Sequence, residues 1–182
     1  NTAVVVAVDD AQCLAIMRLF NETRGRSFLV REGVDESVGK QLGLLGISSI
    51  CNLVAAIKTA KHFEMTSRDV LFLPLTDSMD LYKSRLEEQD VAHGPYSGEL
   101  AAQHFGRYLQ GAGPDHMREL TYPDRKALHN LKYFTWVEQQ QRSVEELDRL
   151  WDPDFWTATF AQVDDWDKQI EAFNARVGLR TV

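Results

Sequence analysis

Two short apolar runs, the first of them largely β-branched, limit what this chain can fold into more than any other feature. Residues 4–8 are Val-Val-Val-Ala-Val, and residues 70–75 are Val-Leu-Phe-Leu-Pro-Leu. Neither run alternates with polar residues, which is typical of a strand buried on both faces of a sheet. Helical patterns separate the two runs, and strands that alternate with helices form parallel sheets. We therefore predict an α/β domain with a parallel sheet over residues 1–95.

Caps and the spacing of apolar residues predict the helices of this domain. A first helix follows the first run and is capped by Asp10. A long amphipathic helix begins at Ser48 or the serine after it, and Ser78 opens a further helix. Residues 21–45 have no clear period, so we predict an irregular segment with a short strand at residues 28–30.

The remainder of the chain carries no strand pattern and several signals for helix starts. These signals are Ser97, Pro123, Ser143 with Glu146 as a capping box, and Pro153. Large aromatic residues recur along the predicted helices and indicate faces that are buried against something. We predict an all-helical carboxy-terminal extension over residues 96–182.

Composition and charge exclude several classes of function. The chain has 182 residues and a net charge of −7, and neither half offers the basic surface of a nucleic-acid binder. No apolar run approaches the ~20 residues of a membrane helix. Cys13 and Cys51 are the only cysteines, which favours reduced thiols in a cytoplasmic protein. Asn1 leads almost directly into the first predicted strand, so we expect an amino-terminal half or a partner subunit to complete the sheet.

Two short stretches carry polar residues where α/β proteins bind ligands. Gly46-Ile47-Ser48-Ser49 lies at a predicted helix start, where unpaired N–H groups attract anions. Residues 74–78, Pro-Leu-Thr-Asp-Ser, lie at the carboxyl end of a predicted strand, the edge at which open α/β sheets bind ligands. A plain helix cap and a plain turn remain the alternatives for these two stretches.

Metal sites are not predicted. The five histidines do not have the spacing of metal ligands, and Asp9 and Asp10 suit capping better than coordination. The histidines are His62, His93, His104, His116 and His129.

These stretches together resemble the second half of the tryptophan synthase β-type, or fold type II, pyridoxal 5′-phosphate (PLP) enzymes. The nearest group is the cysteine synthase and cystathionine β-synthase family. Three stretches match in the same order: residues 5–10 as a strand ending in an acidic residue, Gly46-Ile47-Ser48-Ser49 as a helix start, and residues 73–82 with Leu-Pro, Ser and Tyr. Residues 124–126 and 129–133 are similar to a bacterial subgroup described as cysteine-synthase-like.

The resemblance implies roles for particular residues. Ser78 would bond the pyridine nitrogen of PLP, with Thr76, Asp77 and Gly46 beside the cofactor. Ser48 and Ser49 would bind the substrate. The family's Schiff-base lysine has no counterpart in this sequence, so no catalytic residue is assigned to this chain.

The implied function is that of a carboxy-terminal portion or subunit of a PLP-dependent lyase or transferase. It would catalyse β-elimination or β-replacement on a small amino-acid substrate. A dehydratase, an ammonia-lyase or a threonine synthase of the same fold is an alternative, and so is a non-catalytic interaction module. Because enzymes of this type are generally dimers, we expect a homodimer to which the aromatic faces of residues 97–182 contribute.

Overall fold

The computed structural model describes residues 2–179, and helices make up most of them. Two compact units are present: one is formed by Val4–Arg118, and the other by residues 2–3 together with 119–179. The boundary predicted between residues 95 and 96 thus falls inside the first unit. Each unit is described by itself below.

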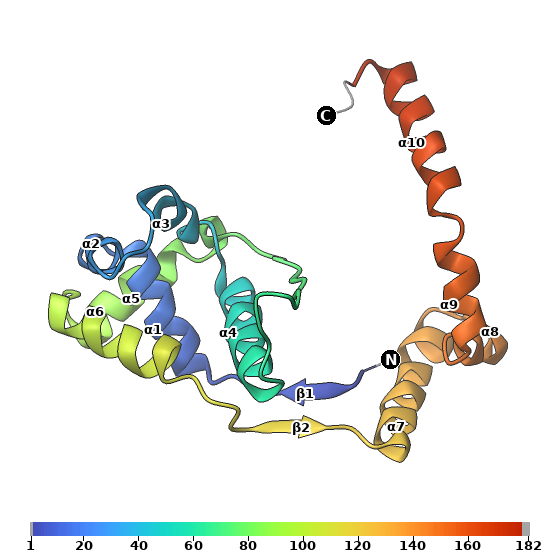
Figure 1. The fold of residues 1–182 in the computed structure, drawn as a ribbon, viewed down its shortest axis with the longest axis horizontal. Helices are drawn as coiled ribbons and strands as arrows, with labels where there is room; N and C mark the ends of the chain where they lie inside the picture. The colour runs from blue at the N-terminus through green and yellow to red at the C-terminus, as the bar shows by residue number, and fades with distance from the viewer. Residues whose placement is uncertain (1, 180–182) are drawn as a thin grey trace. The chain divides into compact units, whose positions relative to one another are not determined.

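The predicted parallel sheet is wrong. Within the described residues the sheet has two strands, β1 (Val4–Val6) and β2 (Met117–Glu119), which run in opposite directions (Figure 1). The antiparallel register is shown by the bond from the Ala7 amide to the His116 carbonyl, 3.0 Å long. Strand β2 lies in the stretch for which the sequence predicted helices alone.

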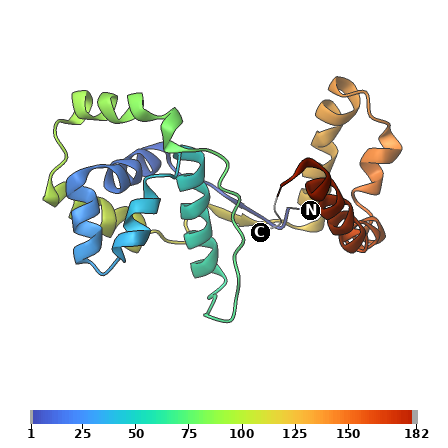
Figure 2. The same cartoon turned by 90° about the horizontal axis from the view of Figure 1, so that it is seen from above.

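The second predicted strand does not form, for a physical reason. Residues 70–75 form neither a helix nor a strand, and Val70 and Phe72 are 87% and 90% exposed. A central parallel strand needs a neighbour on each side, and the described residues supply none beside this segment. Figure 2 shows the long connection that follows α4 (Ile47–His62) and contains it.

Helices fill the rest of the first unit. Asp9, not the predicted Asp10, caps the first of them, because its Oδ1 accepts from the Ala11 amide at 2.7 Å. The stretch predicted to be irregular folds into two helices, so the short strand at residues 28–30 is absent. The helices other than α4 are α1 (Asp10–Asn21), α2 (Thr23–Arg31), α3 (Glu36–Leu42), the 3-10 helix η1 (Met79–Leu81), α5 (Lys83–His93), α6 (Gly98–His104) and the π-helical η2 (Phe105–Gln110).

The core of this unit is built around α1. Ile16, Met17 and Leu19 are completely buried, and Leu29 of α2 and Val54 of α4 lie in the same apolar cluster. Each such side chain contributes roughly 1.5–3 kcal/mol on leaving water. The helix α4, predicted as amphipathic, therefore packs its apolar face against α1 as its spacing requires.

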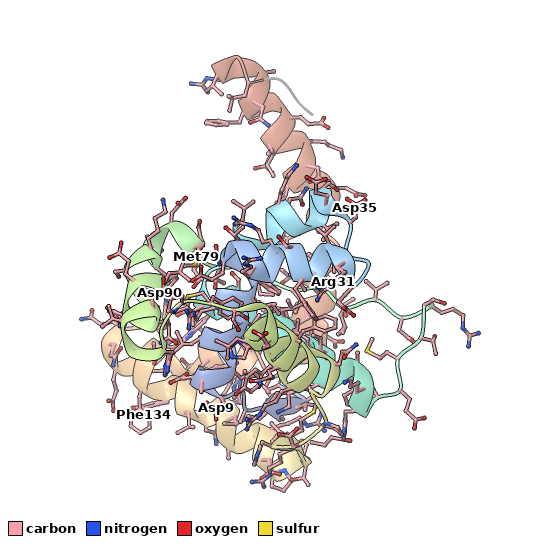
Figure 3. All side chains as sticks on the ribbon, turned by 90° about the vertical axis from the view of Figure 1, so that its left-hand side faces the viewer. Asp9, Arg31, Asp35, Met79, Asp90 and Phe134 are labelled. Carbon is pink, nitrogen blue, oxygen red and sulfur yellow. The ribbon has the colours of Figure 1, made fainter. Side chains whose placement is uncertain are left out.

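The charged side chain of Arg18 lies inside this apolar core. The Arg18 side chain is 2% exposed, and its Nη2 donates to Asp90 Oδ1 at 2.5 Å and to the Gly94 carbonyl at 2.8 Å. Its guanidinium also lies over the Tyr96 ring, 4.9 Å from the centroid. Asp90, labelled in Figure 3, belongs to α5. Arg18 thus joins α1 to α5 and to the turn that follows it.

The second unit is helical, as the sequence predicts for this part of the chain. The Ser143–Glu146 capping box is confirmed, and a second box joins Thr121 to Asp124. The single helix expected from Pro153 onwards is divided into two. The elements are α7 (Tyr122–Tyr133), the π-helical η3 (Phe134–Gln139), α8 (Val144–Arg149), α9 (Pro153–Phe160) and α10 (Val163–Val177). Among residues 2–179, no helix combines the length and apolar character needed to cross a bilayer.

Removing Arg18 should destabilise the first unit strongly. Arg18→Ala is expected to lower the free energy of unfolding by about 3–5 kcal/mol, because it breaks a buried charged network and leaves a cavity. Lys40→Ala removes a cation from the exposed pair with Glu36 and should change stability little. Urea unfolding followed by circular dichroism measures both variants. If the two variants lose equal amounts of unfolding free energy, burial of Arg18 adds no stability beyond that of an exposed ion pair.

Candidate functional site

The amino terminus of α4 is the centre of the candidate site. Its cap residue, Gly46, has no side chain to offer the first helical amides. Asp77 caps the helix instead, from a position 29 residues beyond Ser48. Its carboxylate accepts from the Ser48 amide at 2.9 Å and from the Ser49 amide at 2.8 Å. The Ser49 hydroxyl donates to the same carboxylate at 2.7 Å.

Backbone contacts hold the two stretches together around this cap. The Gly46 amide donates to the Asp77 carbonyl at 3.3 Å, and the Met79 amide donates to the Leu44 carbonyl at 3.1 Å. These bonds form an antiparallel bridge between Leu45 and Ser78. Gly46 is required at this point, since a Cβ there would lie 2.6 Å from the Asp77 Cγ.

Six residues share this hydrogen-bonded arrangement, and we refer to them as the Asp77 cluster. The cluster consists of Gly46, Ser48, Ser49, Asp77, Ser78 and Tyr82. Five of these six were predicted as cofactor- or substrate-binding residues, and Tyr82 was part of the family resemblance. The sixth predicted residue, Thr76, is next to Asp77 in the chain but exposed. The structure therefore brings together two stretches that the sequence singled out separately.

The electrostatics of the cluster favour an ionised Asp77. Partial desolvation acts to raise the pKa of this carboxyl, but hydrogen bonds from Ser49 and Ser48 outweigh it and lower the pKa from 3.8 to about 2. The Tyr82 hydroxyl also bonds to the carboxylate, and this bond raises the pKa of Tyr82. Asp77 thus remains charged at neutral pH and stabilises the positive end of the helix dipole.

The hydroxyl groups of the cluster differ in their exposure and in the hydrogen bonds that they already make. Ser49 is fully buried and uses its hydroxyl on Asp77. Ser78 accepts a bond from the Asp80 amide at 3.3 Å, and its hydroxyl also bonds to the exposed Asp80 carboxylate. Ser48 is exposed at the first turn of α4. Because Asp77 already occupies the helix amides, a ligand here would meet hydroxyl donors before it met free backbone N–H groups.

Cavities of the first unit lie away from this cluster, and two of them are lined in part by a buried cation. One of about 430 Å³ is lined in part by Arg18, His104 and Tyr108. The other, of about 370 Å³, is lined in part by Lys58 and Arg107. Burial lowers the pKa of His104 from its ordinary value. No group of three or more metal-binding side chains is found among the described residues.

Lys58 is a buried polar residue that sequence reasoning missed. Its side chain is 4% exposed, and its Nζ donates to the Ala7 carbonyl at 2.9 Å and lies 3.5 Å from an Asp115 carboxylate oxygen. The helical repeat places Lys58 at the edge of the apolar face of α4, next to Val54. That edge position was the available signal, since a long lysine side chain at the edge of such a face can extend into the core.

Comparisons of the chain with family models, curated proteins and solved structures found no match.

Breaking the Asp77 cap should destabilise α4 and the segment attached to it. Asp77→Ala is expected to lower the free energy of unfolding by about 1–2 kcal/mol, because two helix amides and one hydroxyl lose their acceptor. Gly46→Ala should have a similar effect, since its methyl group would displace the carboxylate. Thr76→Ala, at the exposed neighbouring position, serves as the control. The comparison is made by urea unfolding at neutral pH.

The contribution of Asp77 should also depend on pH with a defined sign. Its pKa is lower in the folded state than in the unfolded chain, so the stabilisation is complete above about pH 4 and is lost as the pH falls towards 2. Asp77→Asn should therefore flatten this part of the stability profile relative to wild type. Parallel profiles over this range would contradict the assigned role of Asp77.

Proposed function

We propose that this chain is the carboxy-terminal portion or subunit of a PLP-dependent lyase or transferase of the cysteine synthase type. The observation that carries the proposal is the convergence of Gly46–Ser49 with Ser78 and Tyr82 around Asp77. These two stretches lie far apart in the sequence, since Asp77 is 29 residues beyond Ser48. Residues that hold one ligand must meet in space, and these residues do.

Ser78 suits contact with a pyridine nitrogen. Its hydroxyl accepts from the Asp80 amide and bonds to the exposed Asp80 carboxylate, and on cofactor binding its proton would turn from that carboxylate to a neutral ring nitrogen. When bound, PLP would supply an electron sink that permits elimination or replacement of a β-substituent. A neutral hydroxyl leaves the ring nitrogen uncharged, whereas an adjacent carboxylate would favour its protonation. Ser48, at the exposed first turn of α4, would face the amino-acid substrate.

The lysine that holds the cofactor covalently would come from another segment or subunit. The lysines nearest to the cluster in sequence are engaged elsewhere: Lys40 with Glu36, Lys58 with the Ala7 carbonyl and Asp115, and Lys83 with Asp80. The amino-terminal half or partner subunit would also bind the cofactor phosphate. This division is consistent with Asp77 occupying the α4 amides, because those amides are then not needed for a phosphate.

A non-catalytic interaction module is the second candidate. It is favoured by the exposed apolar segment that contains Val70 and Phe72. Figure 3 shows the side chains of the connection after α4 projecting away from the helices. An exposed apolar segment that forms no helix or strand of its own can add a strand to a partner. Cofactor content separates the two candidates, because an interaction module would contain none.

The proposal predicts a bound cofactor and a specific role for Ser78. The native protein, purified with any polypeptide that accompanies this chain, should release about one PLP per copy on alkaline denaturation. Ser78→Ala should weaken reconstitution with PLP by roughly 10-fold, the effect of one lost hydrogen bond. Ser27→Ala is the matched control, because this exposed hydroxyl bonds only to the Thr23 carbonyl of its own helix.

Substrate assays then distinguish the possible reactions. Turnover of an O-activated serine or of cysteine would support β-replacement or β-elimination, and turnover of threonine would indicate a dehydratase. Native protein that contains no PLP, or a Ser78→Ala variant with wild-type affinity for it, would overturn the proposal.

A further inference from the structure

Helix α10 presents an apolar stripe that nothing in its own unit covers. Five residues of the helix are spaced alternately three and four positions apart, and their side chains are 40–60% exposed. This spacing is the heptad pattern by which helices pair in coiled coils. The five residues are Val163, Trp166, Ile170, Phe173 and Val177. The helix is labelled in Figure 1.

The order of side chains along the stripe favours one orientation of a partner helix. The positions at Val163, Ile170 and Val177 are β-branched aliphatic, whereas those at Trp166 and Phe173 are aromatic. In a parallel pair of such helices, each aromatic residue would face an aromatic residue, and the layers between them would contain aliphatic side chains alone. In an antiparallel pair each aromatic residue faces an aliphatic one, so every layer combines a large and a small side chain.

Charges along α10 favour the same orientation. Asp164 and Asp165 lie in the first turn, and Arg176 lies in the last. Antiparallel pairing brings the acidic end of one helix to the basic end of the other and also aligns the helix dipoles favourably. With the two-fold axis between Ile170 and Phe173, Asp167 would face Asn174 of the second copy, with no like charges opposed.

We propose that α10 is a docking surface for α10 of a second copy of this chain, in antiparallel orientation. The layers would be Ile170 against Phe173 and Trp166 against Val177, each occurring twice by symmetry. A helix of 15 residues is about 22 Å long, so the seam is small for a protein interface. The association is therefore expected to be reversible at micromolar concentrations. The surface is independent of the Asp77 cluster and of any cofactor.

The test is the mass of the whole 182-residue chain in solution. Sedimentation velocity from about 1 to 200 µM should show a reversible monomer–dimer equilibrium. Ile170→Glu places a charge in the seam and should weaken the dimer at least 10-fold. Ala175→Glu adds the same charge on the opposite face of α10, where it should have no effect. Circular dichroism verifies that both variants retain the helical content of wild type.

Orientation is tested by a second matched pair of variants at Asn174. In the antiparallel register Asn174→Lys would face Asp167 of the other copy and should tighten the dimer several-fold, whereas Asn174→Glu should weaken it. In a parallel pair this position would face Gln169, so the two variants would not differ in this way. Added salt should reduce the difference between them.

Three results would overturn the proposal. The first is a wild-type chain that remains monomeric over the whole concentration range, which would mean that the stripe is covered within the same chain. The second is an Ile170→Glu variant that associates as strongly as wild type. The third is a pair of Asn174 variants with equal affinities, which would exclude the antiparallel register.

Discussion

The link between Asp77 and the amino terminus of α4 is the interaction on which much of the first unit depends. Without it, the connection after α4 would lose the hydrogen bonds that hold Asp77 against the start of that helix. The cap fixes Ser78 beside Leu45, and the residue after it, Met79, then enters the core. The same bond therefore completes a helix, closes a long loop and places the hydroxyl groups of the candidate site. A charged cap is effective here because the helix dipole and two amides converge on one carboxylate.

Buried cations organise the remainder of this unit. Arg18 bonds to the Gly94 carbonyl and Asp90, and Lys58 bonds to the Ala7 carbonyl and Asp115. In both cases a charge within the apolar interior bonds to a backbone carbonyl and pairs with a carboxylate at the surface. Such an arrangement ties elements distant in the sequence together, because an unsatisfied buried charge would be costly. Each cation also lines one of the two cavities.

The structure changes how the family resemblance is to be understood. The start of α4 was expected to receive a ligand directly, yet Asp77 engages its amides, and the serine hydroxyl groups nearest to solvent are those of the exposed Ser48 and the half-buried Ser78. A cofactor at this cluster would therefore be positioned through hydroxyl contacts to its ring, with its phosphate held by another polypeptide segment. Exposure of Val70 and Phe72 fits the same view, since an exposed apolar segment outside any helix or strand is suited to pairing with such a partner.

Local signals in the sequence determined the caps at Ser97 and Ser143, the amphipathic helix α4, most of the helices after Ser97, and the two stretches that form the Asp77 cluster. These features depend on residues within a few positions of one another, or on a strong period. Tertiary structure alone decided that residues 70–75 remain unpaired, that β1 joins β2, that Arg18 and Lys58 are buried, and that Asp77 rather than a neighbouring residue caps α4. Strand pairing and capping from a distance require partners far apart in the sequence, and no local pattern specifies which partner will be in reach.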